Sequence, residues 1–233
     1  MAQLIVLLPT RNEEEGLSEV IERIPERTII ERGFNLRVIV VDGFSSDSTC
    51  EIAKSKGVEL IHQSGETGKG TGVRQALGAI LAEKTGEGDL LVMLDADATY
   101  HPEDILEFLT NLEDNDVVWG SRLRGKMERG AMTITNRIGN IFLSFMASIV
   151  YFKRTTDLCT GYWGFRLNSL RGIALTAVGF NLEADLFSSV CKKKMKTKEI
   201  VIDYDHREGQ SNLKWYIDGP RILFMILKKR ITR

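Results

Sequence analysis

Short, largely apolar runs alternate with stretches of helical periodicity through the first half of this chain, and no other feature constrains its fold as strongly. The runs have the length of buried strands and cover 4–8, 36–41, 58–62, 90–94 and 117–119. Between them, apolar residues recur every three or four positions over 13–24, 71–84 and 102–112, and over a stretch ending at 56. This alternation predicts an α/β fold, a Rossmann-like and mostly parallel sheet flanked by helices.

The second half is less regular. We expect an apolar helix over Thr135–Phe152, a helix over Leu182–Lys192 and a strand over Lys198–Tyr204. The tail, Trp215–Arg233, is apolar with a basic end. We interpret the chain as one catalytic domain over 1–213 followed by a helix over 214–233. The apolar helices of the C-terminal part, 135–152 and 214–233, are expected to be amphipathic.

Composition excludes several classes of protein. A formal net charge of −1 argues against a protein that holds nucleic acid. Three scattered cysteines (Cys50, Cys159 and Cys191) show no metal-ligand spacing, and their odd number is typical of a reducing compartment. No uncharged apolar run reaches the ~20 residues of a bilayer span, and the first residues do not read as a signal peptide. We therefore expect a cytoplasmic protein.

The sharpest chemical signal is Asp95-Ala96-Asp97, directly after a buried strand. Two carboxylates two residues apart on extended backbone point the same way, and their charges repel unless a cation lies between them. Mg²⁺ or Mn²⁺ held by one or two carboxylates and a substrate's phosphates meets this need. Capping of the next helix would explain one carboxylate but not both. Asp42 also ends a strand, where it would contact a ligand or form an Asx-turn.

Several motifs then follow in a recognisable order. They are Pro9-Thr10-Arg11-Asn12-Glu13, Val40-Val41-Asp42, Gly68-Lys69-Gly70, Asp95-Ala96-Asp97, Gly120-Ser121-Arg122, the run from Asp157 to Arg166, and the run from Arg207 to Leu213. The ordered set resembles the family 2 glycosyltransferases with the GT-A fold. Within that family it is most similar to the polyprenyl-phosphate (dolichyl-phosphate) hexose synthases, which attach mannose or glucose to the lipid phosphate.

The resemblance implies a role for particular positions. The donor nucleotide sugar would be bound by Pro9, Arg11, Glu13, Asp42, Lys69, Asp95, Ala96 and Asp97, with the metal on Asp95 and Asp97. Catalysis would rest on Asp97, Arg122, Arg137 and Arg207, and phosphates of donor or acceptor would contact Arg122, Arg137, Arg207, Ser211 and Lys214. The sugar pocket would include Trp163, for which core packing is the alternative, and Glu183 or Asp185, between which spacing does not choose.

The acceptor decides the mechanism. A phosphate monoester, with a second pKa of about 6, is already largely ionised at neutral pH and needs no general base. We therefore expect transfer of a hexose from GDP-mannose or a UDP-hexose to polyprenyl phosphate, by one in-line displacement with inversion. The alternative is a family 2 enzyme acting on a sugar hydroxyl, which needs a carboxylate base such as Glu183 or Asp185. A protein that binds the sugar nucleotide without turnover is a further alternative.

Two apolar segments suggest contact with a membrane. Apolar residues recur at helical spacing over 135–152, and Lys228-Lys229-Arg230 follows the apolar run 222–227. Apolar surface beside cations is typical of peripheral binding to an anionic bilayer face, here the inner face of the membrane. A core helix or a homodimer interface would also explain 135–152.

Overall fold

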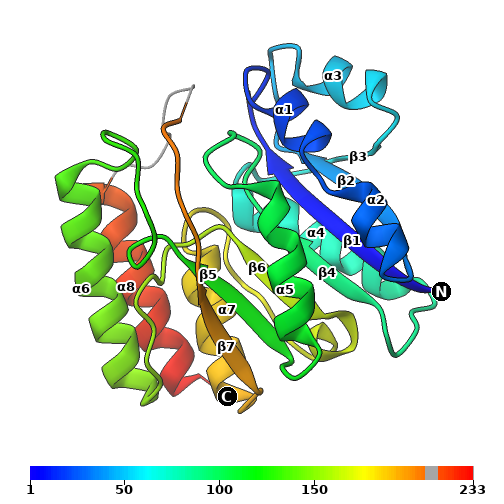
Figure 1. The fold of residues 1–233 in the computed structure, drawn as a ribbon. Coiled ribbons are helices and arrows are strands. Elements are labelled where there is room, and N and C mark those ends of the chain that lie inside the picture. The colour runs from blue at the N-terminus through cyan, green and yellow to red at the C-terminus, as the bar shows by residue number, and fades with distance from the viewer. Residues whose placement is uncertain (208–214, 233) are drawn as a thin grey trace.

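The computed structural model describes residues 1–207 and 215–232, and a seven-stranded sheet forms its centre (Figure 1). The strands are β1 (Ala2–Thr10), β2 (Phe34–Asp42), β3 (Glu59–His62), β4 (Leu90–Met93), β5 (Val117–Ser121), β6 (Trp163–Arg166) and β7 (Thr197–Val201). Their order in the sheet is β3-β2-β1-β4-β6-β5-β7. All pairings are parallel except the two that β6 makes. The predicted mostly parallel α/β sheet is confirmed.

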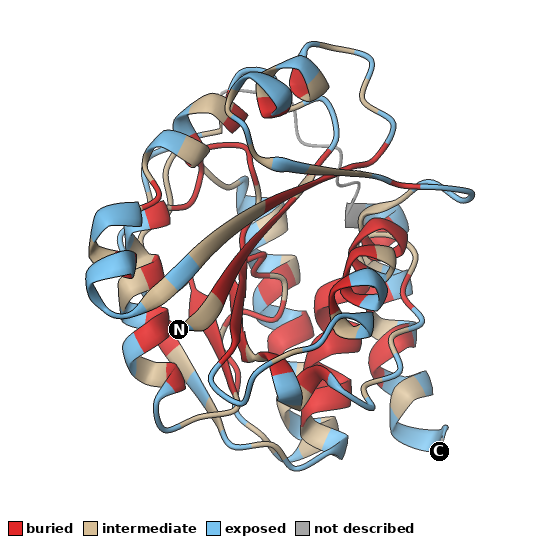
Figure 2. Ribbon diagram, turned by 90° about the vertical axis from the view of Figure 1, so that its right-hand side faces the viewer, coloured by how far each residue is buried: buried red, intermediate tan, exposed pale blue. Residues whose placement is uncertain are grey.

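Helices cover both faces of this sheet. They are α1 (Leu17–Glu22), α2 (Glu26–Glu31), α3 (Thr49–Ser55), α4 (Lys69–Ala82), α5 (Ile105–Leu112), α6 (Ile134–Tyr151), α7 (Leu182–Lys192) and α8 (Trp215–Ile231), with short 3₁₀ helices η1 (Pro102–Asp104) and η2 (Leu167–Leu170). One core cluster joins α4, α6, α7 and α8 to the sheet, and a second joins α1, α2, α3 and α5 to the other face. Figure 2 shows the buried residues gathered along the strands and the inner sides of these helices.

Strand register explains why polar residues meet at one edge. In β1, residues 4–8 alternate between the two core clusters, so both faces of the strand are buried. The parallel register sets Thr10 beside Asp42 and Asp42 beside His62. The polar residues that follow each apolar run therefore lie at the same carboxyl edge, as ligand sites in parallel sheets require.

Strand β6 was not predicted, because four residues that include a glycine give no readable alternation. It lies antiparallel between β4 and β5, with Met93 opposite Trp163. This register turns Trp163 into the core, where it is 0 % exposed and its ring lies 5.4 Å from that of Trp119. The structure therefore corrects the expectation that Trp163 walls a sugar pocket.

Helix α8 packs against α6 and α7 as part of the same body. Ile222, Met225 and Ile226 belong to the core. Lys229 Nζ lies 2.7 Å from Asp185 Oδ1 of α7, so this lysine is not free to face a bilayer as the basic run suggested. Within 1–207 and 215–232, no helix is both long and apolar enough to cross a membrane.

Candidate active site

A cavity at the carboxyl edge of the sheet gathers most of the predicted donor-binding residues. Its lining includes Pro9, Arg11, Glu13, Lys69, Asp95, Asp97 and Arg207. A neighbouring cavity shares Lys69, Asp95, Asp97 and Arg207 with it and adds Arg122 and Glu183. Charged side chains from distant parts of the chain thus converge on one site, as the motif order predicted.

Asp95 and Asp97 differ in their surroundings. The Asp95 side chain is 29 % exposed, and its Oδ1 lies 2.6 Å from Lys69 Nζ. Asp97 is buried: its Oδ1 accepts hydrogen bonds from the backbone N–H and hydroxyl of Thr99, and its Oδ2 lies 3.2 Å from Arg207 Nε. Burial and the nearby charge of Asp95 raise the pKa of Asp97. The alternative of helix capping does not apply to Asp97, because the residue that precedes η1 is His101.

The residues present fit the divalent ion that the family implies. Asp95 and Asp97 offer hard carboxylate oxygens at the cavity, and Mg²⁺ or Mn²⁺ takes few protein ligands beside substrate phosphates. Gly161 keeps the place open, since a Cβ there would lie 2.3 Å from Asp95 Oδ2. Ala96, by contrast, is 1 % exposed and packs in the core, so its expected place in the donor site is corrected.

Lys69 joins the acidic pair to α7. Its Nζ lies 2.7 Å from Glu183 Oε1 as well as 2.6 Å from Asp95 Oδ1. Burial alone would lower the pKa of Lys69, but the charges of Asp95 and Glu183 outweigh burial and raise the pKa. Glu183 is buried too, and burial raises its pKa although Lys69 opposes this.

Asp185 serves a different purpose. It is 0 % exposed, and its Oδ2 accepts hydrogen bonds from the backbone N–H groups of Thr176 (2.5 Å) and Ala177 (2.8 Å). It does not line either cavity of the site. Of the two acidic candidates for the sugar pocket, the structure places only Glu183 at the cavity.

Arg207 closes the other side of the site. Its Nη2 donates to Glu13 Oε1 at 2.6 Å, which links the segment after β1 to the segment after β7. Burial raises the pKa of Glu13 to about 8, despite the opposing charge of Arg207. Ser211 and Lys214, the other predicted phosphate contacts of this stretch, lie outside the described residues.

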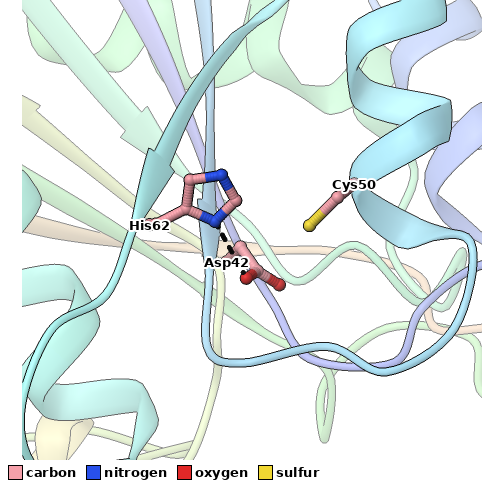
Figure 3. A group of neighbouring side chains, drawn as sticks. All are labelled: Asp42, Cys50 and His62. Carbon is pink, nitrogen blue, oxygen red and sulfur yellow. Dashed lines mark hydrogen bonds and ion pairs between the residues drawn. The ribbon is translucent and has the colours of Figure 1, made fainter.

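Asp42, which was expected at the donor site, is buried and does not line the cavity. Its Oδ1 accepts a hydrogen bond from the backbone N–H of Ser45 at 3.0 Å, and its Oδ2 lies 3.3 Å from His62 Nδ1, with Cys50 close by (Figure 3). Burial would raise the pKa of Asp42, but the hydrogen bonds lower it. The neighbours Val41 and Gly43 line the cavity in its place. The oxygen, sulfur and nitrogen atoms of this cluster lie within 4.8 Å of one another and could hold a metal ion, which the cysteine spacing did not indicate.

Arg122 is bound by a carboxylate that sequence reasoning gave no role. Its Nε and Nη2 each donate to Asp157 at 2.8 Å, and its guanidinium carbon lies 5.0 Å from the ring centre of Tyr204. Asp157, 1 % exposed, also accepts a hydrogen bond from Asn140 of α6. Arg122 therefore lines the second cavity with its Nε and Nη2 held by Asp157, and Asp157 links this arginine to α6 through Asn140. In the sequence, the only sign of a role for Asp157 is that it begins the motif that ends at Arg166.

Arg137 is exposed on the first turn of α6 and lines neither cavity, whereas Asn136 beside it lines the second. An apolar groove of about 640 Å³ runs between α6 and α8. It is lined by residues such as Ile138, Phe142, Leu143, Pro220, Ile222 and Leu223. The groove and the second cavity share the lining residues Asn136, Asn140 and Cys159, so the two lie side by side.

The sheet order, and the acidic pair at its carboxyl edge, place the protein in the GT-A class of α/β glycosyltransferases. A family model described as glycosyl transferase family 2 matches residues 5–173, and the chain belongs to this family. The resemblance predicted from the motifs is confirmed.

Two relatives come from Haloferax volcanii. The glycosyltransferase AglJ is 34 % identical over 97 % of this chain and 71 % of its own length. A protein named dolichyl-phosphate hexose transferase is 32 % identical over 97 % of this chain and 92 % of its own. A solved structure, glucosyl-3-phosphoglycerate synthase from Mycobacterium tuberculosis with Mn²⁺, UDP and phosphoglyceric acid, shares the fold with a TM-score of 0.74 and 16 % identity, covering 100 % of this chain and 80 % of that one.

Proposed function

We propose that this protein transfers a hexose from a nucleotide diphosphate sugar, GDP-mannose or a UDP-hexose, to polyprenyl phosphate. The observation that carries the proposal is that the charged cavity and the apolar groove lie side by side, with Asn136, Asn140 and Cys159 lining both. An acceptor with an anionic head and a long apolar tail would place its head in the charged cavity and its tail in the apolar groove. The relative named dolichyl-phosphate hexose transferase supports the same acceptor.

The charged cavity would bind the donor by its diphosphate. Lys69 and Arg207 are the cations available beside the acidic pair. A Mg²⁺ or Mn²⁺ ion on Asp95 and Asp97 would supply Lewis-acid stabilisation of the departing nucleoside diphosphate. Pro9 and Arg11 also line the cavity, and the base and ribose would bind against them.

The acceptor phosphate needs positioning rather than deprotonation, because it already carries negative charge at neutral pH. Arginine suits this task as a permanent, planar donor. Arg207, the described arginine that lines both cavities, would hold this phosphate in line with the anomeric carbon, and Arg137 would meet it at the rim of α6. A single displacement inverts the anomeric configuration, so a retained configuration in the product would contradict this mechanism.

The α6–α8 face would rest on the inner, cytoplasmic face of a membrane. Exposed apolar side chains on the two helices include Ile138, Phe142, Phe145, Ile149, Phe224 and Leu227. Exposed cations accompany them at Arg137, Arg221, Lys228 and Arg230. Peripheral membrane proteins bind anionic bilayers through apolar surface with neighbouring cations. Pairing of this face with a second copy of the chain is the competing arrangement.

Transfer to a sugar hydroxyl is the second candidate function, and one observation favours keeping it: Glu183 lies at the cavity, where a general base would be needed. Its carboxylate, however, is paired with Lys69 at 2.7 Å. A base held by an ammonium is a weak proton acceptor, so the phosphate acceptor is favoured.

The test offers GDP-mannose, UDP-glucose and UDP-N-acetylglucosamine to purified protein with Mn²⁺, each with and without a short polyprenyl phosphate. Labelled sugar should enter the organic phase with one of these donors. Asp97→Ala should abolish the transfer, and Arg137→Ala should reduce it. If nucleotide is released only when a glycan is added, the hydroxyl-acceptor function replaces the one proposed.

A further inference from the structure

Lys69 occupies an oxygen that a metal ion would need. Its Nζ lies 2.6 Å from Asp95 Oδ1 and 2.7 Å from Glu183 Oε1, and its side chain is only 15 % exposed. An ion that uses Asp95 Oδ1 must therefore displace a buried ammonium. Taking one of its two carboxylate partners from a buried ammonium is costly unless another anion replaces it.

The backbone that carries Lys69 is fixed by close packing. Gly68 and Gly70 flank Lys69, and a Cβ on either would lie 2.4 Å and 2.6 Å from the carbonyl oxygens of Val178 and Ala177 respectively. Gly68 also has a φ of +147°, which side-chain-bearing residues rarely adopt. The start of α4 is thereby packed tightly against 177–178.

The segment against which α4 packs is itself fixed. Asp185 accepts hydrogen bonds from the backbone N–H groups of Thr176 and Ala177. Thr71 N–H donates to the carbonyl oxygen of Val178 at 2.9 Å. The backbone of Lys69 is therefore fixed, and only its side chain can move toward a new partner at the site.

We propose that Lys69 acts as a placeholder for the metal, so that a divalent ion and the donor's diphosphate bind cooperatively. The ion takes the Asp95 oxygen, and the diphosphate accepts the displaced ammonium, which keeps its contact with Glu183. The ion alone leaves the ammonium with Glu183 but without Asp95, and the diphosphate alone, by drawing the ammonium away, leaves Asp95 without a cation. The inference rests on the proposed nucleotide diphosphate donor, but not on the identity of the acceptor.

The experiment measures Mn²⁺ binding rather than turnover. Free Mn²⁺ is followed by electron paramagnetic resonance during titration of the protein alone and with UDP or GDP, after subtraction of the Mn²⁺ that the free nucleotide holds. In the wild-type protein we expect one of the nucleotides to tighten Mn²⁺ binding by about 5-fold or more, within the usual range of coupling. By reciprocity, Mn²⁺ should tighten nucleotide binding by the same factor.

Lys69→Met should bind Mn²⁺ more tightly than the wild type in the absence of nucleotide, and the tightening by nucleotide should largely disappear. The double variant K69M/E183Q removes both charges of the buried pair, so that a folding defect from an unpaired Glu183 is avoided. It should also bind Mn²⁺ more tightly than the wild type in the absence of nucleotide, and the tightening by nucleotide should largely disappear. Lys84→Met, at an exposed lysine beyond the other end of α4, is the matched control and should keep the wild-type coupling.

Two results would overturn the inference: Mn²⁺ binding by K69M and K69M/E183Q no tighter than by wild type, or no effect of either nucleotide on Mn²⁺ binding by the wild type. Failure of the lipid-transfer assay alone would remove the proposed acceptor and leave this coupling standing.

Discussion

At the scale of single residues, the site depends on side chains that hold other side chains. Asp157 fixes Arg122, and Asp185 fixes the segment against which Lys69 is packed. Gly161 contributes by lacking a side chain, since a Cβ there would lie 2.3 Å from Asp95 Oδ2. Such positioning roles carry no residue-type signature, because they arise from distances between segments far apart in the sequence.

Gly161→Ala should therefore displace the Asp95 carboxylate. We expect Mn²⁺ affinity to fall by 10-fold or so, within the range of metal-site perturbations of about 10–100-fold. Calorimetric Mn²⁺ titration in the presence of nucleotide measures this. Gly78→Ala, where a Cβ meets nothing within 4 Å, is the control and should leave the affinity unchanged. Wild-type affinity in the Gly161 variant would show that Asp95 does not bind the ion.

At the scale of elements, α6 has two distinct sides. Asn140, Leu143, Ser144 and Ala147 face inward and are buried. Ile138, Phe142, Phe145 and Ile149 are at least 51 % exposed. The groove between α6 and α8 lies beside the second cavity, and Ile138 and Phe142 of this apolar surface line it. In the proposed function, a lipid acceptor would lie along the groove with its phosphate at the neighbouring cavity.

The variant F142S/F145S/I149S should lose most binding to vesicles that contain anionic lipid. Each removed side chain forfeits roughly 1.5–3 kcal/mol of apolar burial if it inserts fully. Co-sedimentation measures binding, and thermal unfolding should stay near wild type because these side chains are already exposed. Unchanged vesicle binding would contradict the membrane proposal, and a shift from dimer to monomer in light scattering would assign the face to a second copy of the chain.

At the scale of the whole molecule, α8 completes the core. Ile222, Met225 and Ile226 close the cluster formed by α6, α7 and the sheet. Lys229 adds a polar anchor: its Nζ lies 2.7 Å from Asp185 Oδ1 and 3.1 Å from Ser189 Oγ. The last helix is thereby tied to the same part of the molecule that positions the start of α4.

Lys229→Met should destabilise the protein by about 3–5 kcal/mol, since it leaves the buried carboxylate of Asp185 without its cation. The neighbouring Lys228→Met is a matched control, because Lys228 is exposed and its loss should change stability by less than about 0.5 kcal/mol. Urea unfolding of both variants gives the comparison. Equal stabilities would mean that α8 is not anchored through Lys229.

The sequence alone determined the α/β class, the position of the acidic pair at a strand end and the family. These follow from local patterns: apolar runs set strands, periodicity sets helices, and parallel strands bring their carboxyl ends to one edge. The convergence of Glu13, Lys69, Asp95 and Arg207 on one cavity was anticipated from motif order.

Only the tertiary structure decided which residues face the cavity. Glu183 and Asp185 differ by two positions on one helix, a rotation of about 200°, so one reaches Lys69 and the other the buried backbone of 176–177. Trp163 turned inward because β6 inserted between β4 and β5. Lys229 belongs to a basic run in the sequence, but in the structure it pairs with the buried Asp185. In each case, side-chain direction was fixed by a neighbour distant in sequence, and no local pattern encodes that neighbour.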